Sequence, residues 1–414
     1  MPQNAIVHRA PRLPASRLGR PGDDPIFALN AEATSRRARG ESIVNATVGS
    51  LLNDDGTLAV LPTAARAVKE VGATEWASYA PIQGPVPFLK AVADDVFGAR
   101  RDLCGQAVVA ATPGGTGALR HAIATFLEPG QSLLTTSYYW GPYQTIADEQ
   151  ERRVATFSMF APGGGLDVDA LDRAVGEHVA REGRALVILN DPCQNPTGYS
   201  MTSAEWEAAA HVVGRHAEHA PVAVLLDAAY AAYGPQRGVE GPIAALEPVA
   251  DRALVLVAWS ASKAFTHYGL RVGALVALSA DATERAEIGA ALTYACRGTW
   301  SNCNRGGMAA VTRLLTDPVL RPAVDGERAG LVSLLNERVA AFNDAAHAVG
   351  LRYPRYDGGF FTTVFAEDAY GAAERMRRDG VYCVPIAGAL RLGLCSVARG
   401  DVARLVEAVA RATA

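Results

Sequence analysis

A single lysine, Lys263, lies in a sequence context that points to chemistry. It follows one apolar run, "ALVLVAWS" (253–260), and precedes another, "VGALVALS" (272–279). Burying an ammonium group without a partner is costly, so a lysine at the end of a buried strand needs a reason. An amine in a pocket could form a Schiff base with an aldehyde. Ser260 and Arg271, on either side of the lysine, could supply a hydroxyl and a guanidinium fork to a phosphate.

The stretch "ATPGGTGALRHAIATFL" (111–127) is a second candidate for binding a phosphate. Gly115 and Thr116 stand where a helical pattern begins, and free backbone N–H groups at a helix start attract anions. Considered by itself, the stretch is better explained as a plain tight turn, because glycine-rich turns before helices are common. Its spacing matches neither a P-loop nor a dinucleotide fingerprint.

Four further residues indicate a ligand only when they are considered together. Asp227 could form an ion pair with a pyridinium nitrogen, which would strengthen that ring as an electron sink. Asn195 and Tyr230 could hydrogen-bond a ring hydroxyl, and Trp140 offers a flat face for stacking. Taken singly, Asp227 could be a helix cap, Asn195 a turn residue and Trp140 a core residue. Taken with the lysine and the phosphate candidates, the set describes one ligand, pyridoxal phosphate.

Short apolar runs separated by amphipathic segments must position these side chains. The runs cover residues 107–112, 132–137, 185–190, 222–227, 253–260 and 272–279. With helical patterns such as 203–219 between them, they predict an α/β fold with a mostly parallel sheet and helices on both faces. Ligands on such sheets gather beyond the carboxyl ends of the strands. Asn195, Asp227 and Lys263 all fall at or just past those ends.

The same patterns divide the chain into predicted parts. A long helical stretch (330–350) and a strand–helix–strand tail predict a second, smaller α/β unit at the C-terminus, joined by part of the N-terminal region. The predicted boundaries are 1–22 for a flexible N-terminal arm, 23–55 for an N-terminal segment, 56–325 for a large cofactor-binding domain and 326–414 for the small domain.

Composition narrows the class of protein. The chain has 414 residues, of which 49% are hydrophobic and 20% charged, as in ordinary globular proteins. A net charge of −4 argues against a nucleic-acid or membrane surface. The six cysteines include no Cys-x-x-Cys pair, so we expect reduced thiols and a cytoplasmic location rather than disulfides or zinc. The histidines of "HVVGRHAEH" (211–219) have a spacing that does not converge on one ion, so no metal is expected.

The motifs, in their order along the chain, resemble those of fold-type I pyridoxal phosphate-dependent aminotransferases of the aspartate and aromatic amino-acid subgroup. The similar segments are "DPIFAL" (24–29), "NATVGSLLNDDGTLAVLP" (45–62), "YAPIQG" (79–84), "GGTGAL" (114–119), "NPTG" (195–198), "DAAY" (227–230), "SASKAFTHYGLRVG" (260–273), "RGTWSN" (297–302) and "GVYCVPIAGALRLG" (380–393). Short motifs in the same order over nearly the whole chain are highly specific.

This resemblance implies a role for each matching residue. The implied catalytic residues are Lys263, Asp227 and Tyr230. The implied cofactor ligands are Gly115, Thr116, Trp140, Asn195, Asp227, Tyr230, Ser260, Lys263 and Arg271, with Tyr79 reaching the phosphate of a neighbouring subunit. The implied substrate contacts are Gly49, Trp140, Asn195, Arg297 and Arg391. Arg391 would hold the α-carboxylate, and Arg297 would cross a dimer interface to a distal carboxylate. A homodimer with shared active sites follows from the resemblance.

The resemblance implies amino transfer between an L-amino acid, dicarboxylic or aromatic, and a 2-oxo acid by a ping-pong mechanism. The chain departs from the family at "SLL" (50–52), at Gly141-Pro142, at "SNCN" (301–304) and at a shortened "PIAGAL" (385–390). These departures all fall on the substrate rim. Elimination, replacement, decarboxylation or oxidation therefore stay open as alternatives, because the same cofactor supports them. Arg297 could also be a purely structural interface residue.

Overall fold

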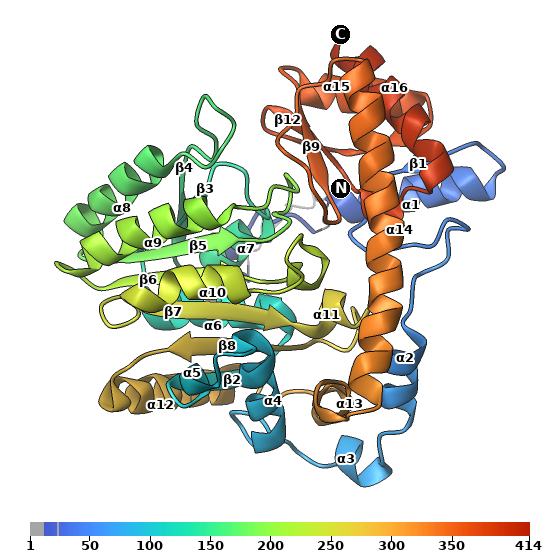
Figure 1. Ribbon diagram of the computed structural model, residues 1–414. Helices are drawn as coiled ribbons and strands as arrows, with labels where there is room; N and C mark the ends of the chain where they lie inside the picture. The colour runs from blue at the N-terminus through green and yellow to red at the C-terminus, as the bar shows by residue number, and fades with distance from the viewer. Residues whose placement is uncertain (1–11, 23–24) are drawn as a thin grey trace, which may run out of the picture.

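A seven-stranded sheet forms the centre of the larger part of the molecule (Figure 1). The computed structural model describes residues 12–22 and 25–414. The strand order is β2-β8-β7-β6-β5-β3-β4, and every neighbouring pair is parallel except the two that involve β8. The strands are β2 (Ala107–Pro113), β3 (Ser132–Thr136), β4 (Arg153–Phe157), β5 (Ala185–Asn190), β6 (Val222–Asp227), β7 (Leu254–Ser260) and β8 (Val272–Leu278). The prediction of an α/β fold with a mostly parallel sheet is confirmed.

Helices cover both faces of this sheet, which is why its central strands are apolar throughout. Successive side chains of a strand point to opposite faces. In β5, Val187 and Leu189 belong to the apolar cluster that includes residues of α8, α9 and α10, whereas Leu186 and Ile188 belong to the cluster that includes residues of α6, α7 and α12. Both sets of contacts are buried, so the strand reads as a continuous apolar run.

The helices connect the strands and the two parts of the fold. They are α1 (Pro25–Ala38), α2 (Pro62–Lys69), α3 (Ala73–Ala77), α4 (Val86–Phe97), α5 (Arg101–Cys104), α6 (Gly114–Phe126), α7 (Pro142–Glu149), α8 (Val168–Glu182), α9 (Ser203–Ala217), α10 (Glu240–Leu246), α11 (Ala261–Ala264), α12 (Ala282–Thr299), α13 (Arg305–Thr316), α14 (Leu320–Ala348), α15 (Ala369–Arg378) and α16 (Val402–Thr413). Among the residues described, no helix has both the length and the apolar character needed to cross a membrane.

A second, smaller sheet and its helices form the other part of the molecule (Figure 1). The antiparallel strands β11 (Val384–Ile386), β12 (Ala389–Leu392) and β9 (Thr362–Phe365) pack with α14, α15 and α16 around their own apolar core. Strand β1 (Val44–Asn45), from the N-terminal region, pairs in parallel with β10 (Val381–Tyr382). The predicted boundary at residue 326 falls inside α14, which runs through both parts without a break.

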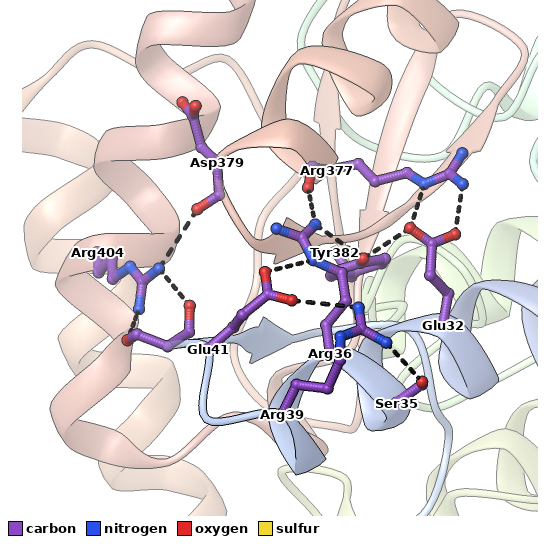
Figure 2. Close-up of polar contacts among 10 residues, drawn as sticks. Glu32, Ser35, Arg36, Arg39, Glu41, Arg377, Asp379, Tyr382 and Arg404 are labelled. Atoms are coloured by element: carbon purple, nitrogen blue, oxygen red, sulfur yellow. Dashed lines mark hydrogen bonds and ion pairs between the residues drawn. The ribbon is translucent and has the colours of Figure 1, made fainter.

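A polar network fastens α1 to this smaller part (Figure 2). The carboxylate of Glu32 accepts hydrogen bonds from Nε of Arg377 and from the Tyr382 hydroxyl, both at 2.9 Å. Arg36 donates to the Tyr382 hydroxyl at 3.0 Å and to the carbonyl of Arg377 at 2.6 Å. Hydrogen bonding from Arg377 is the main reason why the pKa of Glu32 is lowered. The predicted flexible arm lies outside the described residues at 1–11, and within 12–22 it contains Arg17, which pairs with Glu149 of α7 at 3.0 Å.

Candidate active site

The predicted site residues meet at the carboxyl edge of the large sheet. Asp227 is the last residue of β6, directly opposite Asn190 at the end of β5. Lys263 lies on α11, the short helix that follows β7 without an intervening loop. Because these strands are parallel, their ends fall on one edge. Figure 1 shows α11 at this edge, beside α14 and between the two parts of the molecule.

The amine of Lys263 faces an aromatic pocket. Its Nζ donates to the carbonyl of Gly49 at 3.0 Å and lies 4.6 Å from the ring centre of Tyr268 and 5.8 Å from that of Tyr230. Burial lowers the pKa of Lys263 to about 8, since an ammonium group is poorly solvated there. Among the residues described, no carboxylate forms an ion pair with it.

The buried carboxylate of Asp227 carries the charge opposite to that of Lys263. Its Oδ2 accepts a hydrogen bond from the Tyr143 hydroxyl at 2.6 Å, and Oδ1 accepts one from the backbone N–H of Ala229 at 3.3 Å. Burial raises the pKa of Asp227 to about 6, although both hydrogen bonds favour the ionised form. No cation of the described chain pairs with this carboxylate.

The phosphate candidates surround the first turn of α6. No side chain caps this end of the helix, so its first backbone N–H groups are available to a ligand. A Cβ on Gly115 would lie 3.4 Å from that of Ser260, and a Cβ on Gly114 would lie 2.5 Å from Nη2 of Arg271. Thr116 is exposed at the same turn. The structure therefore brings these predicted ligands together around an open cradle.

Asn195, Tyr230 and Trp140 are the remaining predicted contacts of the ring. Asn195 and Tyr230 are buried, and the hydrogen bond between their side chains acts to lower the pKa of Tyr230, although burial outweighs it. Trp140 is half-buried, and its ring meets Tyr143 edge-on at 5.7 Å. The indole is thus oriented by the residue that also contacts Asp227.

Gly49 and Arg391 form the side of the pocket that belongs to the smaller part of the fold. A Cβ on Gly49 would lie 2.8 Å from Cζ of Phe361, so only glycine fits there without displacing that ring. Arg391 is buried, donates from Nη2 to the carbonyl of Thr47 at 2.6 Å, and lies 4.6 Å above the Phe361 ring. Phe361 therefore separates and orients the two predicted substrate contacts.

Tyr79 and Arg297 lie on an outer surface instead. Tyr79 is 87% exposed, and the exposed Arg297 donates to the hydroxyl of Ser301 at 2.6 Å. Arg297 borders a groove of about 1060 Å³, lined also by Val86 and Tyr294. The structure describes one chain, so contributions of these residues to a neighbouring subunit's site stay predictions.

Two polar residues of the site were not predicted from the sequence. Tyr143 holds Asp227, as described above. Asn190 donates from Nδ2 to the carbonyl of Asp227 at 2.8 Å, and its Oδ1 accepts from the backbone N–H of Asn195 at 2.7 Å. Asn190 ends β5 at the same edge, so the strand-end rule that selected Asp227 could have found it. Tyr143 has no comparable signal, since it comes from a helix that follows another strand.

The residues present fit pyridoxal phosphate. A partly buried amine and a buried carboxylate lie at the ends of neighbouring strands, and neither has an ionic partner within the described part of the chain. An aldehyde would neutralise the amine, and a ring with a protonated nitrogen would pair with the carboxylate. The helix start and Arg271 suit a phosphate on the same molecule. No cluster of three or more metal-ligating side chains occurs among the described residues.

Comparison with known proteins agrees with this geometry. Residues 41–409 match the family described as "Aminotransferase class I and II". A tyrosine aminotransferase of Klebsiella pneumoniae is 27% identical over 403 residues, which cover 94% of this chain and 96% of the relative. An aspartate aminotransferase of Pseudomonas aeruginosa is 28% identical over 306 residues, which cover 72% of this chain and 74% of the relative.

Solved structures give the same result. An aminotransferase from Anaerococcus prevotii matches with a TM-score of 0.92 at 30% identity, covering 98% of this chain and 100% of its own. An aromatic-amino-acid aminotransferase from Burkholderia pseudomallei, covalently bound to pyridoxal phosphate, has the same fold, with a TM-score of 0.80 at 24% identity and full coverage of both chains. The chain therefore belongs to the class I and II aminotransferases and is a pyridoxal phosphate-dependent enzyme.

Proposed function

We propose that this aminotransferase moves the amino group of a dicarboxylic or aromatic L-amino acid to a 2-oxo acid. One observation carries the proposal: Lys263 and Asp227 lie at the carboxyl ends of neighbouring parallel strands, and neither is ion-paired among the described residues. Relatives named tyrosine and aspartate aminotransferases support the two substrate classes. When bound, pyridoxal phosphate supplies an aldehyde and an electron sink.

The chain's own groups would grip and polarise the cofactor. Asp227 would keep the ring nitrogen protonated through an ion pair, and Asn195 with Tyr230 would hold the ring hydroxyl. Trp140 would stack on the ring face. The phosphate would bind at the first turn of α6, where the donors that could hold it are Gly115, Thr116, Ser260 and Arg271. These contacts would fix the ring relative to Nζ of Lys263.

Lys263 and Arg391 would then act on the substrate. The guanidinium of Arg391 pairs with the α-carboxylate, which orients the Cα–H bond perpendicular to the ring plane. Nζ of Lys263, with its pKa lowered to about 8, takes the proton from Cα as a general base. Gly49 lets the Phe361 ring pack directly against the loop that would cover the substrate, because a Cβ there would lie 2.8 Å from Cζ of that ring. We also propose a cytoplasmic location, where the six cysteines, all free in the structure, would stay reduced.

A homodimer with shared active sites is the second part of the proposal. The exposed apolar side chains of Val86 and Tyr294 line the groove that Arg297 borders, and those of Trp76 and Tyr79 are also exposed. Exposed apolar surface of this kind marks a protein interface. A partner docked there would place Tyr79 near a phosphate and Arg297 near a distal carboxylate.

Mixing inactive Lys263→Ala and Arg297→Ala subunits should restore activity toward aspartate, because one site in the mixed dimer is intact. Additive activities and a monomer in sedimentation would contradict this.

Lys263→Ala tests the chemical assignment. The variant should bind the cofactor without its visible absorbance band and lose amino transfer, whereas Lys90→Ala, at an exposed lysine that pairs with Asp94, should behave as wild type. In wild type without an acceptor, about one equivalent of 2-oxo acid per site should form, with the substrate's side chain intact. Continuous release of ammonia would instead favour the elimination chemistry.

A further inference from the structure

Arg338 is a buried charge that the proposed chemistry does not use. It lies on α14 and is 0% exposed, one of the largest fully buried side chains in the described chain. Burying a guanidinium is costly unless its donors are satisfied. Nη1 donates to the carbonyl of Cys395 at 2.8 Å, while Nη2 donates to the carbonyl of Leu52 at 2.7 Å and to Oδ1 of Asp54 at 2.8 Å.

These acceptors belong to two segments that both reach the active site. Leu52 is three residues beyond Gly49, whose carbonyl accepts the hydrogen bond from Lys263. Cys395 is four residues beyond Arg391. The segments also touch directly, because the carbonyl of Cys395 accepts the backbone N–H of Leu52 at 2.9 Å. Arg338 therefore connects the loop that contacts Lys263 to the segment that follows Arg391. We call this contact between residues 52–54 and 394–395 the joint.

Asp54 is the anionic partner in this joint. Burial by itself acts to raise its pKa, but the backbone N–H of Arg399 and the guanidinium of Arg338 outweigh this and lower the pKa. The carboxylate is thus ionised at neutral pH. Its side chain is half exposed, so it contributes charge at the rim of the joint. The backbone carbonyls of Cys395 and Leu52 accept from the two terminal nitrogens of the arginine, whereas its Nε has no hydrogen-bond partner among the described residues.

We propose that Arg338 is a positioning residue for amino transfer, which rests on the proposed roles of Lys263 and Arg391. By holding loop 48–54 against residues 394–395, it fixes the distance between the amine of Lys263, which acts at Cα, and the guanidinium of Arg391, which binds the α-carboxylate. The planar fork of an arginine presents two separate nitrogens to the two segments, whereas a lysine offers one compact ammonium. Loss of the fork therefore weakens substrate capture and leaves the cofactor grip on the large sheet intact.

The test compares Arg338→Lys, Asp54→Asn and the control Glu337→Gln in the loaded enzyme. Glu337 is the preceding residue on α14 and pairs with Arg399 on the exposed side. For each variant, kcat, KM for aspartate and for tyrosine, cofactor affinity and Tm are measured. Arg338→Lys should raise KM about 10- to 100-fold, as expected for charged hydrogen bonds, with cofactor affinity unchanged. Asp54→Asn should raise KM by a smaller factor at an unchanged Tm, and Glu337→Gln should match wild type.

A merely structural role would lower Tm and leave the KM of the folded, loaded enzyme unchanged, and that result overturns the proposal. If Arg338→Lys does not fold, Asp54→Asn decides, and a wild-type KM in that variant overturns the proposal as well. Equal losses in Glu337→Gln would also overturn it. If the proposed function itself were wrong, the outcome would be different, because the wild-type enzyme would then form no 2-oxo acid from either substrate.

Discussion

The hydroxyl of Tyr143 lies 2.6 Å from Oδ2 of Asp227, and both side chains are buried. Burial raises the pKa of Tyr143 well above its usual value, so this hydroxyl stays protonated and can only donate toward a carboxylate. A permanent donor stabilises the ionised form of Asp227. It also fixes the carboxylate plane, because the backbone N–H of Ala229 holds the other oxygen.

Removing this donor should weaken the cofactor site. We expect Tyr143→Phe to lower the affinity for pyridoxal phosphate about 10- to 100-fold, the usual worth of a hydrogen bond to a charged group. The pKa of Asp227 should rise further, so activity should be lost at a higher pH on the acidic side of the profile. Cofactor titration and a pH–rate profile measure both effects. Tyr139→Phe is the control, since Tyr139 stacks on Tyr143 at 6.2 Å without contacting Asp227. Equal behaviour of the two variants would contradict the role of Tyr143.

Asp227 should destabilise the protein when the cofactor is absent. Burial raises its pKa from 3.8 to about 6, so the folded chain binds this proton more tightly than the unfolded chain. The stability that this proton contributes is complete below pH 4 and is lost as the pH rises through 6. Asparagine does not ionise, so cofactor-free Asp227→Asn should be more stable than wild type at pH 8, by up to about 3 kcal/mol.

Urea unfolding of both cofactor-free proteins at pH 5 and pH 8 measures this difference, which should be smaller at pH 5. With the cofactor bound, the ranking should reverse, because only the aspartate can pair with the ring nitrogen. A cofactor-free wild type that is the more stable protein at pH 8 would show that the carboxylate has a cationic partner.

Lys263 should set the pH dependence of cofactor capture. Only the neutral amine attacks an aldehyde, and burial lowers the pKa of this lysine to about 8. The neutral fraction, and with it the rate at which the cofactor-free enzyme gains visible absorbance, should rise about tenfold between pH 7 and pH 9 and then level off. Stopped-flow mixing with pyridoxal phosphate measures this rate. A rate that keeps rising tenfold per pH unit above pH 9 would indicate an ordinary exposed lysine.

Apolar patterning was enough to predict most of the sheet. Strand β4 was missed because it lies at the sheet edge and only one of its residues is buried, so its sequence lacks a continuous apolar run. The strand-end rule selected Asp227 and Lys263 because parallel strands deliver their last residues to one edge. Contacts that join segments far apart in the chain have no such local signature. Tyr143 and Arg338 belong to this class, and the main partners of Arg338 are backbone carbonyls, which no sequence pattern reveals.

Gly114 should be intolerant of any side chain, because it lies against the proposed phosphate clamp. Its φ is +74°, and a Cβ would lie 2.5 Å from Nη2 of Arg271. Gly114→Ala should therefore displace the guanidinium and weaken pyridoxal phosphate binding much more than binding of pyridoxal, which has no phosphate. The ratio of the two affinities, measured by absorbance titration, separates an effect on phosphate binding from a general loss of folding.

Gly130→Ala is the matched control, since Gly130 has a φ of +85° and open space where a Cβ would lie. It should show only the strain of a left-handed alanine, about 1–2 kcal/mol in unfolding free energy, with the affinity ratio unchanged. A Gly114→Ala enzyme that keeps the wild-type ratio would place the phosphate away from this turn.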